Sequence, residues 1–221
     1  MTATARPPST DVASAVSAAA ALLAPARDVT LVAHVQPDAD SLGSALALGT
    51  VLSRRGARVR VSFAAPAHAP ESLRPLDALG LLVPPEAVPA EPELLVMCDT
   101  AAPERLGDVR ILDPAAEARV VLVHRRLAEM GAPIDAVVAT CLYAGLVTDT
   151  VGFRTAGPAA HRMAADLLEA GVDVEAVLRP INGDHPFGWL DALAGVLHGA
   201  PLDASAAGGR GFVSAVVPVE V

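Results

Sequence analysis

The sequence predicts an α/β fold with three layers, in which a mainly parallel sheet lies between helices. An apolar run without turn formers, residues 29–35, is typical of a strand that is buried on both faces of such a sheet, and residues 93–100 are a second strand of the buried type. Between them, residues 41–55 carry apolar side chains three and four positions apart, which indicates a helix with one buried face. Strand patterns that alternate with helix patterns are the signature of this fold class.

The N-terminal part is expected to be a disordered lead, residues 1–10, followed by a helix from about residue 11 to residue 23. Its alanine-rich stretch resembles a short signal sequence, but Asp11 interrupts it and no basic segment precedes it. We therefore expect a cytoplasmic protein.

The first strand and helix form one unit, which ends at Gly56. Residues 58–64 alternate between polar and apolar side chains, as in a strand nearer the sheet edge. Residues 65–92 are rich in proline and predict a loop with one short helix at about 72–79.

Further helices are expected after the second buried strand, and one of them concerns His124. Apolar spacing over residues 113–131 indicates an amphipathic helix, so His124 is expected to face solvent rather than to end a strand. The remaining helices are predicted at residues 135–148, 158–170, 173–178 and 187–197. Residues 201–211 have the composition of a linker, and residues 212–221 predict a strand.

Composition excludes several classes of function. A net charge of −9 argues against a protein that holds long nucleic acid through many phosphate contacts. No apolar run is long enough to cross a membrane. Cys98 and Cys141 lie far apart in apolar surroundings and predict two small buried side chains. All sixteen basic residues are arginines, which suits short phosphate ligands, although compositional bias explains it equally well.

The loop after the first strand collects groups with lone pairs. His34, Asp38 and Asp40 lie within seven residues, beside a helix N-terminus and at the carboxyl end of a strand. A bound cation would remove their repulsion, and one imidazole with carboxylates suits Mn²⁺, Mg²⁺ or Fe²⁺. The alternative is a surface turn in which Asp40 or Ser41 caps the helix and His34 is a core residue.

Two more carboxylates follow other elements. Asp99 ends the second buried strand, and parallel strands share their carboxyl ends, so Asp99 is expected to face the first loop. Alternatively, Asp99 only initiates the turn before Pro103. Asp149 ends a helix, where a carboxylate is unfavourable against the dipole unless a positive charge lies near.

These residues carry a resemblance to a family. The pattern HxxPDxDxxGS resembles the first motif of the DHH-family phosphoesterases, above all the oligoribonuclease and phosphoadenosine-phosphate phosphatase branch; its positions here are His34, Pro37, Asp38, Asp40, Gly43 and Ser44. Asp99 matches the second motif, and the segment GLVTDT with Asp149 matches the fourth. The resemblance implies that His34, Asp38 and a bridging Asp99 hold one metal ion. It implies that Asp40, Asp99 and Asp149 hold a second.

The chain departs from the family pattern in two places. No Asp-His-His triplet occurs in the sequence, and the gap falls near Gly107 and Asp108, so one central strand is expected to be missing. The metal-binding domain is expected over residues 11–205, with residues 206–221 forming a linker and the first strand of a truncated substrate domain. The sheet either keeps a gap or closes it, and an exposed edge would favour a homodimer.

By resemblance, the expected function is a metal-dependent phosphoesterase that hydrolyses short oligoribonucleotides or 3′-phosphoadenosine 5′-phosphate. Two Mn²⁺ or Mg²⁺ ions would activate water between them, with Asp99 and Asp40 at the catalytic positions. Loss of the triplet is expected to impair the second ion site, so that one ion remains. Arg154 is a candidate for holding a phosphate oxygen. The alternative is a non-catalytic remnant that binds a metal or a nucleotide.

Overall fold

A computed structural model describes residues 12–98, 123–124, 127–128, 130–182, 185 and 187–216. The chain divides into two compact units, Met1–Asn182 and Gly183–Val221, and each is considered by itself. The domain limits expected from the sequence, 11–205 and 206–221, stay a prediction.

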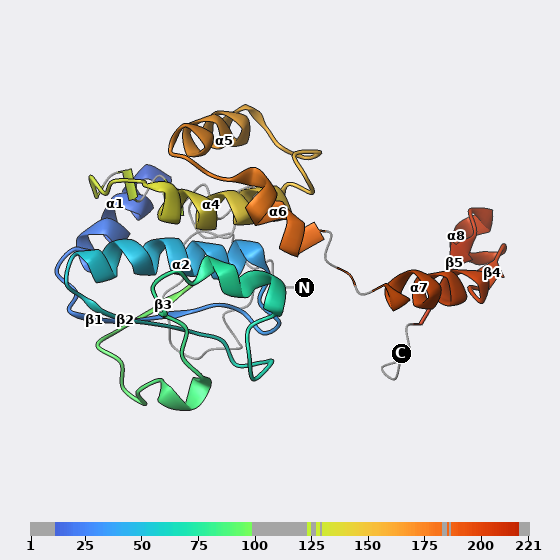
Figure 1. Ribbon diagram of the computed structural model, residues 1–221, viewed down its shortest axis with the longest axis horizontal. Coiled ribbons are helices and arrows are strands. Elements are labelled where there is room, and N and C mark those ends of the chain that lie inside the picture. The colour runs from blue at the N-terminus through green and yellow to red at the C-terminus, as the bar shows by residue number, and fades with distance from the viewer. Residues whose placement is uncertain are drawn as a thin grey trace, which may run out of the picture. The chain divides into compact units, whose positions relative to one another are not determined.

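The first unit is built on a parallel sheet of three described strands. These are β1 (Asp28–Val32), β2 (Arg58–Ser62) and β3 (Leu94–Met97), in the order β2-β1-β3 (Figure 1). Val32 is in register with Ser62 on one side and with Met97 on the other, so the three strands end together. The predicted α/β class and parallel sheet are confirmed. Strand β2 is the outermost named strand on its side, where Val61 also forms a parallel bridge with Leu82.

The strand β1 is shorter than predicted, because the chain bends away from the sheet before residue 35. Ala33 still donates a hydrogen bond to the Ser62 carbonyl at 2.9 Å. Gln36 then has a φ of 54°, a left-handed conformation that a strand does not contain. Its N–H donates to the Ala65 carbonyl at 2.6 Å, which fixes the bend. His34 therefore lies in a loop and not at the end of a strand.

Helix α2 (Ala39–Arg54) packs between the sheet and helix α4 (Ala136–Asp149), as Figure 1 shows. The two helices approach most closely at Gly43, where a Cβ atom would lie 2.4 Å from the Cys141 carbonyl oxygen. No side chain larger than hydrogen fits there without a backbone shift. This glycine therefore sets the distance between α2 and α4.

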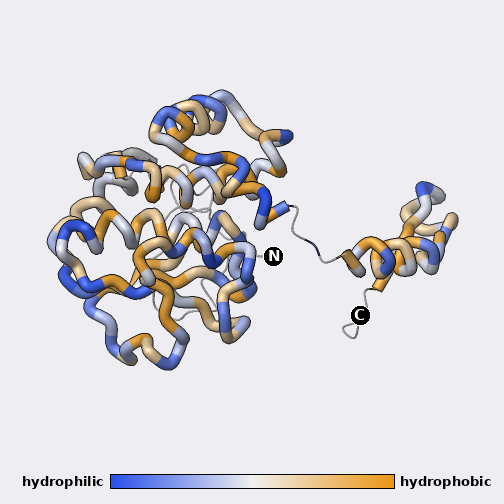
Figure 2. The backbone as a smooth tube through the Cα atoms, in the orientation of Figure 1, coloured by the Kyte–Doolittle hydropathy of each residue, from blue (hydrophilic) through white to orange (hydrophobic). Residues whose placement is uncertain are grey.

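The remaining elements of the first unit surround this pair. They are α1 (Val12–Leu23), the 3₁₀ helices η1 (Glu71–Leu76) and η2 (Pro85–Ala87), α5 (Pro158–Glu169) and α6 (Val174–Asn182). Apolar residues of β1, α2 and α4 form one core, which the hydropathy colours of Figure 2 follow. The helix predicted at 72–79 is thus the 3₁₀ helix η1 at 71–76. Helix α6 extends to residue 182, whereas the sequence predicted its end at residue 178.

The structure also shows whether His124 belongs to a helix or to the end of a strand. Residues 123 and 124 are helical, as predicted, rather than part of a strand. His124 is half-buried, and its orientation toward solvent stays a prediction, because most of residues 113–131 lie outside the described part.

The second unit contains α7 (Gly188–His198), α8 (Ala206–Gly209) and the two-residue strands β4 (Leu202–Asp203) and β5 (Phe212–Val213). The strands pair antiparallel, so the predicted linker at 201–211 is a short hairpin. Asp203 causes the turn, because its Oδ1 accepts hydrogen bonds from Ser205 and from the Ala206 N–H. The strand predicted at 212–221 is confirmed only for its first two residues, and residues 217–221 lie outside the described part.

Both cysteines are free and buried, as expected from their apolar contexts. The Cys141 thiol donates to the Leu76 carbonyl at 3.3 Å, and burial raises its pKa to about 12. Cys141 is therefore protonated at neutral pH. Among the helices in the described ranges, none is long and apolar enough to cross a membrane.

Candidate functional site

Three of the predicted site residues lie at the carboxyl edge of the sheet: His34 and Asp38 in the loop between β1 and α2, and Asp40 in the first turn of α2. Asp38 is exposed, His34 is half-buried, and Asp40 retains only 4% of its exposure. Ligands of open α/β sheets bind at this edge, beyond the carboxyl ends of the strands.

Asp38 forms the N-terminal cap of α2. Its Oδ1 accepts a hydrogen bond from the Ser41 N–H at 2.8 Å, and its own N–H donates to the Ser41 hydroxyl at 3.2 Å. This reciprocal capping box fixes the side chain at the entry to the helix. The alternative in which Asp40 or Ser41 is the capping residue is wrong, because the acceptor is Asp38.

His34 faces Asp38 with its second ring nitrogen. Nδ1 lies 2.8 Å from the Val35 carbonyl oxygen, which can only accept, so Nδ1 carries the proton. Nε2 lies 3.5 Å from Asp38 Oδ1. Nε2 therefore points toward a carboxylate, and a proton or a metal ion between the two atoms makes this contact favourable. A histidine that donates one N–H to a backbone carbonyl is also the usual form of a metal ligand.

Asp40 lies in the buried layer between α2 and α4. The Ser44 hydroxyl donates to its Oδ1 at 3.5 Å. Gly145 of α4 lies in close contact with Asp40, since a Cβ atom at position 145 would lie 3.0 Å from the Asp40 Cα and 3.3 Å from its Oδ1. The glycine of the GLVTDT segment therefore allows the two helices to close around this carboxylate.

Asp149 is the last residue of α4 and is exposed. It follows Gly145 by four positions, so both residues share one face of the helix. Gly43 lies opposite Cys141 and Asp40 lies opposite Gly145, which means that α2 and α4 run antiparallel. Asp149 is therefore about one helical turn beyond Gly145, in the direction of the loop before α2.

Asp99 lies outside the described residues, as do Gly107, Asp108 and the segment around them. The described strand ends one residue earlier, where the Cys98 N–H donates to the Val32 carbonyl at 2.8 Å. Position 98 is thus at the same sheet edge as the His34 loop. The role of Asp99 itself stays a prediction.

The chemistry of the donors fits a hard divalent cation. One imidazole nitrogen and carboxylate oxygens are ligands that suit Mn²⁺ or Mg²⁺. Within the described ranges, no three His, Cys, Asp or Glu side chains lie close enough together to hold a metal ion. His34 and Asp38 are therefore a pair that needs at least one further ligand, and Asp99 is the predicted one.

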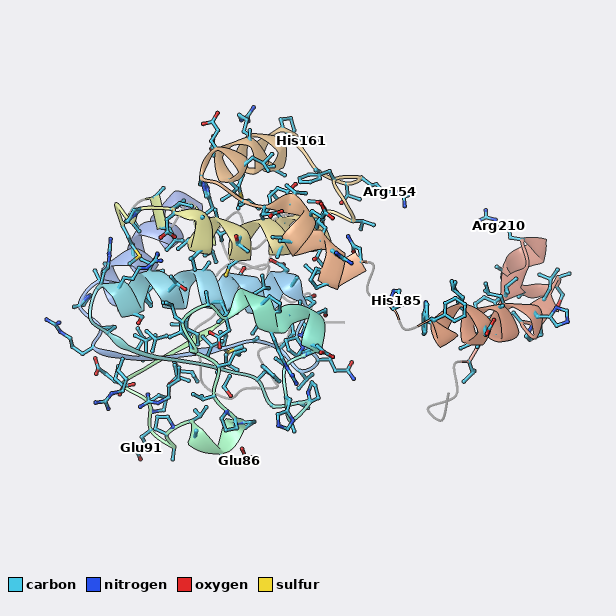
Figure 3. The ribbon with its side chains drawn as sticks, in the orientation of Figure 1. Glu86, Glu91, Arg154, His161, His185 and Arg210 are labelled. Atoms are coloured by element: carbon cyan, nitrogen blue, oxygen red, sulfur yellow. The ribbon has the colours of Figure 1, made fainter. Side chains whose placement is uncertain are left out.

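The turn after α4, residues 150–156, carries Arg154. Thr150 is buried and organises it: the Thr150 hydroxyl donates to the Leu146 carbonyl at 2.6 Å and accepts from the Phe153 N–H at 3.1 Å. Arg154 is exposed on this turn (Figure 3). Neither Thr150 nor Phe153 was predicted as a site residue, although Thr150 lies within the segment GLVTDT that carries Asp149 and Phe153 follows it by three positions.

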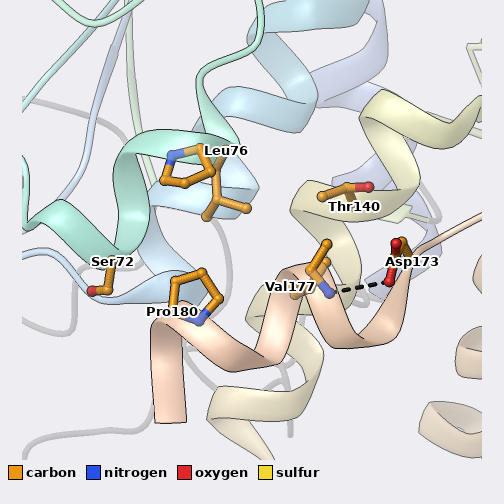
Figure 4. Close-up of a pocket in the computed structure, with 8 residues that line it drawn as sticks. Ser72, Leu76, Thr140, Asp173, Val177 and Pro180 are labelled. Atoms are coloured by element: carbon orange, nitrogen blue, oxygen red, sulfur yellow. Dashed lines mark hydrogen bonds between the residues drawn. The ribbon is translucent and has the colours of Figure 1, made fainter. Parts of the chain in front are cut away.

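A cavity of about 150 Å³ lies between η1, α4 and α6 (Figure 4). Its lining includes Leu76, Thr140, Val177 and Pro180 and is mostly apolar. None of the predicted site residues lines it, and Thr140 is more than two helical turns before Asp149. We therefore do not assign the candidate site to this cavity.

Comparison with known proteins supports a phosphoesterase relationship. No protein-family profile matches the chain. Over 163 residues the chain is 29% identical to a bifunctional oligoribonuclease and PAP phosphatase, NrnA, of Thermus thermophilus; the match covers 65% of this chain and 50% of that protein. The chain thus spans about half the length of this curated relative.

The fold is similar to that of a solved protein. The crystal structure of an exopolyphosphatase-related protein from Bacteroides fragilis superposes with a TM-score of 0.75 at 20% identity; the match covers 86% of this chain and 66% of that one. At this identity the likeness concerns the fold. The chain is thus similar in sequence to an oligoribonuclease and PAP phosphatase, and similar in fold to an exopolyphosphatase-related protein.

Proposed function

We propose that the chain is a divalent-metal-dependent phosphoesterase that acts on short oligoribonucleotides or on 3′-phosphorylated adenosine nucleotides. One observation carries the proposal: the Nε2 atom of His34 faces Asp38 at 3.5 Å, at the carboxyl edge of the sheet, while the other ring nitrogen is already bonded. The substrate class rests on the name of the relative from Thermus thermophilus.

The proposed ligands divide into two sets. His34 and Asp38, with Asp99, would hold one ion, and Asp40, Asp99 and Asp149 would hold a second. Mn²⁺ or Mg²⁺ bound there supplies Lewis acidity for activating water and for neutralising the charge of the phosphate. The capping box keeps the Asp38 carboxylate in place, and the bond from Nδ1 to the Val35 carbonyl orients the imidazole of His34.

Arg154 is proposed to contact a phosphate oxygen of the substrate. Its guanidinium is exposed and makes no ion pair with any residue of the described ranges. A planar guanidinium that is not neutralised by an acid is suited to binding phosphate with two parallel hydrogen bonds.

Catalysis by this chain is proposed to be weak. The sequence contains no Asp-His-His triplet, and by resemblance the second ion then lacks its nitrogen ligand. Losing a ligand of a two-ion site removes several kcal/mol of stabilisation from the transition state, and each 1.36 kcal/mol lowers the rate about tenfold.

A second candidate function is binding without catalysis, of one metal ion or of a nucleotide. The observation that favours it is the missing triplet.

Hydrolysis of a ribodinucleotide with Mn²⁺ separates the two candidates. The unchanged chain is compared with Asp99→Ala and with Asp191→Ala, which removes an exposed acid from α7 as a matched control. A slow, Mn²⁺-dependent rate that is lost only in Asp99→Ala supports the phosphoesterase. Equal background rates in all three proteins, with a melting temperature that Mn²⁺ still raises, support binding alone.

A further inference from the structure

Three aromatic rings form a row from the core to the surface beside the turn after α4. Tyr143 is buried, Phe153 is half-buried, and His161 of α5 is exposed. The Tyr143 and Phe153 ring centroids are 6.1 Å apart with the planes tilted by 56°. Phe153 and His161 are stacked, with centroids 5.5 Å apart and planes at 23°. One face of the exposed His161 ring is thus covered by the Phe153 ring.

The backbone that presents Phe153 has an unfavourable conformation. Val151 and Phe153 have φ values of 51° and 67°, in the left-handed region that a β-branched or bulky residue rarely adopts. Three hydrogen bonds to Thr150 and Val147 hold the turn: from the Phe153 N–H at 3.1 Å, the Thr155 N–H at 3.2 Å and the Gly152 N–H at 2.8 Å. Such strain persists only where the surroundings fix it, and it concentrates at ligand-binding sites.

The turn also has a local charge that differs from that of the whole protein. The chain carries a net charge of −9, yet Arg154, His161 and Arg162 are all exposed within nine residues. Figure 3 shows Arg154 and His161 on adjoining segments, the turn and α5. A short turn links them to Asp149 at the candidate metal site.

We propose that His161, supported by Phe153, is a stacking platform for the base of a nucleotide whose phosphate lies at the candidate metal site; this rests on the proposed function. A flat ring with one face covered by Phe153 offers its other face for stacking, as in proteins that bind single-stranded nucleic acids. Arg154 contributes the positive charge for a phosphate of the same ligand. The platform recognises the base, whereas the acids and His34 act on the phosphate.

The test compares a ligand that has a base with one that lacks it. Binding of adenosine 3′,5′-bisphosphate and of ribose 5-phosphate is measured by calorimetry with Mn²⁺ for the unchanged chain, His161→Ala and His161→Phe. We expect His161→Ala to weaken the nucleotide about tenfold and to leave ribose 5-phosphate unchanged, because only the base stacks. His161→Phe restores the nucleotide affinity. His68→Ala, which removes another exposed imidazole, is expected to change neither ligand.

Each other outcome has a distinct meaning. Equal losses for both ligands in His161→Ala, no loss for the nucleotide, or no rescue by phenylalanine would overturn the stacking platform and leave the proposed function standing. If neither ligand binds the unchanged chain, the proposed function fails, and the platform fails with it.

Discussion

The two ends of the antiparallel pair α2 and α4 use the same capping device in different electrostatic surroundings. At one end, Asp135 caps α4 by accepting from the Val138 N–H at 3.2 Å, and Arg54 lies 2.8 Å from its other oxygen. At the opposite end, Asp38 caps α2, and its ionic neighbour is His34 at 3.5 Å.

The difference shows which end is structural and which is a candidate site. An arginine is always charged, so the Arg54–Asp135 pair is complete without any added ion. At the other end, Asp38 lies 3.5 Å from Nε2 of His34, whose Nδ1 already donates to a carbonyl. A proton or a bound cation between Nε2 and the carboxylate would make this contact favourable, which is what the proposed function requires.

The largest expected effect comes from separating the two helices. A Cβ atom at position 43 would lie 2.4 Å from the Cys141 carbonyl oxygen, and neither atom can move without shifting a backbone. We expect Gly43→Ala to lower the free energy of unfolding by about 3 kcal/mol, measured by urea denaturation at neutral pH.

The matched control is Gly195→Ala in α7. No atom lies within 4 Å of a Cβ placed there, so alanine is expected to stabilise this helix slightly through its higher propensity. Unchanged stability of Gly43→Ala would mean that α2 and α4 are farther apart than described, and the shared site of Asp40 and Asp149 would lose its basis.

The second effect concerns the charge at the end of the helix pair that Asp38 caps, which we call the open end. Asp38→Asn keeps a good capping residue but removes the negative charge, so stability without metal is expected to stay within about 0.5 kcal/mol. The affinity for Mn²⁺ is expected to fall about tenfold or more, which reduces the increase in melting temperature that Mn²⁺ causes.

The same substitution can be made at the end of the helix pair that Asp135 caps, which we call the closed end. Asp135→Asn also changes a capping aspartate, but its charge partner is Arg54, and we expect no change in the effect of Mn²⁺. Equal losses of the Mn²⁺ effect in both variants would show that the two ends do not differ as described.

The sequence predicted the strands and helices well where apolar residues recur at one regular spacing along the segment. Parallel pairing of β1 with β3 followed from two apolar runs, and the end of α2 followed from Gly56. The end of β1 was placed three residues too late, because Val35 is apolar yet exposed after the bend. A hydrogen bond from Gln36 to Ala65, 29 residues away, causes that bend and leaves no local pattern.

The candidate site was predicted in part for a similar reason. The motif placed His34, Asp38 and Asp40 in one loop, but capping by Asp38 depends on backbone geometry at the start of α2. The ring row of Tyr143, Phe153 and His161 joins a helix, a turn and another helix. Spacing along the chain does not report such contacts, since they arise only when α4 and α5 pack.

The third effect is a pH-dependent loss at the closed end. Burial by itself would raise the pKa of Asp135, but the hydrogen bond from Arg54 and those from the Val138 and Val137 N–H groups outweigh it and lower the pKa below 3.8. A depressed pKa stabilises the fold above the ordinary value and ceases to do so as pH falls through the folded-state pKa. We expect Asp135→Ala to cost about 1 kcal/mol at neutral pH.

Urea denaturation near neutral pH and below the folded-state pKa measures this dependence. The difference between the unchanged chain and Asp135→Ala should shrink in acid, because both lack the charge there. A difference that is the same at both pH values would mean that the charge contributes nothing and that the ends of the helix pair differ only in geometry.

The smallest effect is a gain in stability at the turn beside the open end. Val151 is exposed and has a φ of 51°, so asparagine, which tolerates this conformation, should replace it with little loss of packing. We expect Val151→Asn to raise the free energy of unfolding by about 0.5 kcal/mol, measured by urea denaturation. Val151→Ala also removes the exposed side chain but stays strained. An equal gain in both variants would therefore assign the effect to lost apolar surface, and the turn would no longer differ from the unstrained closed end.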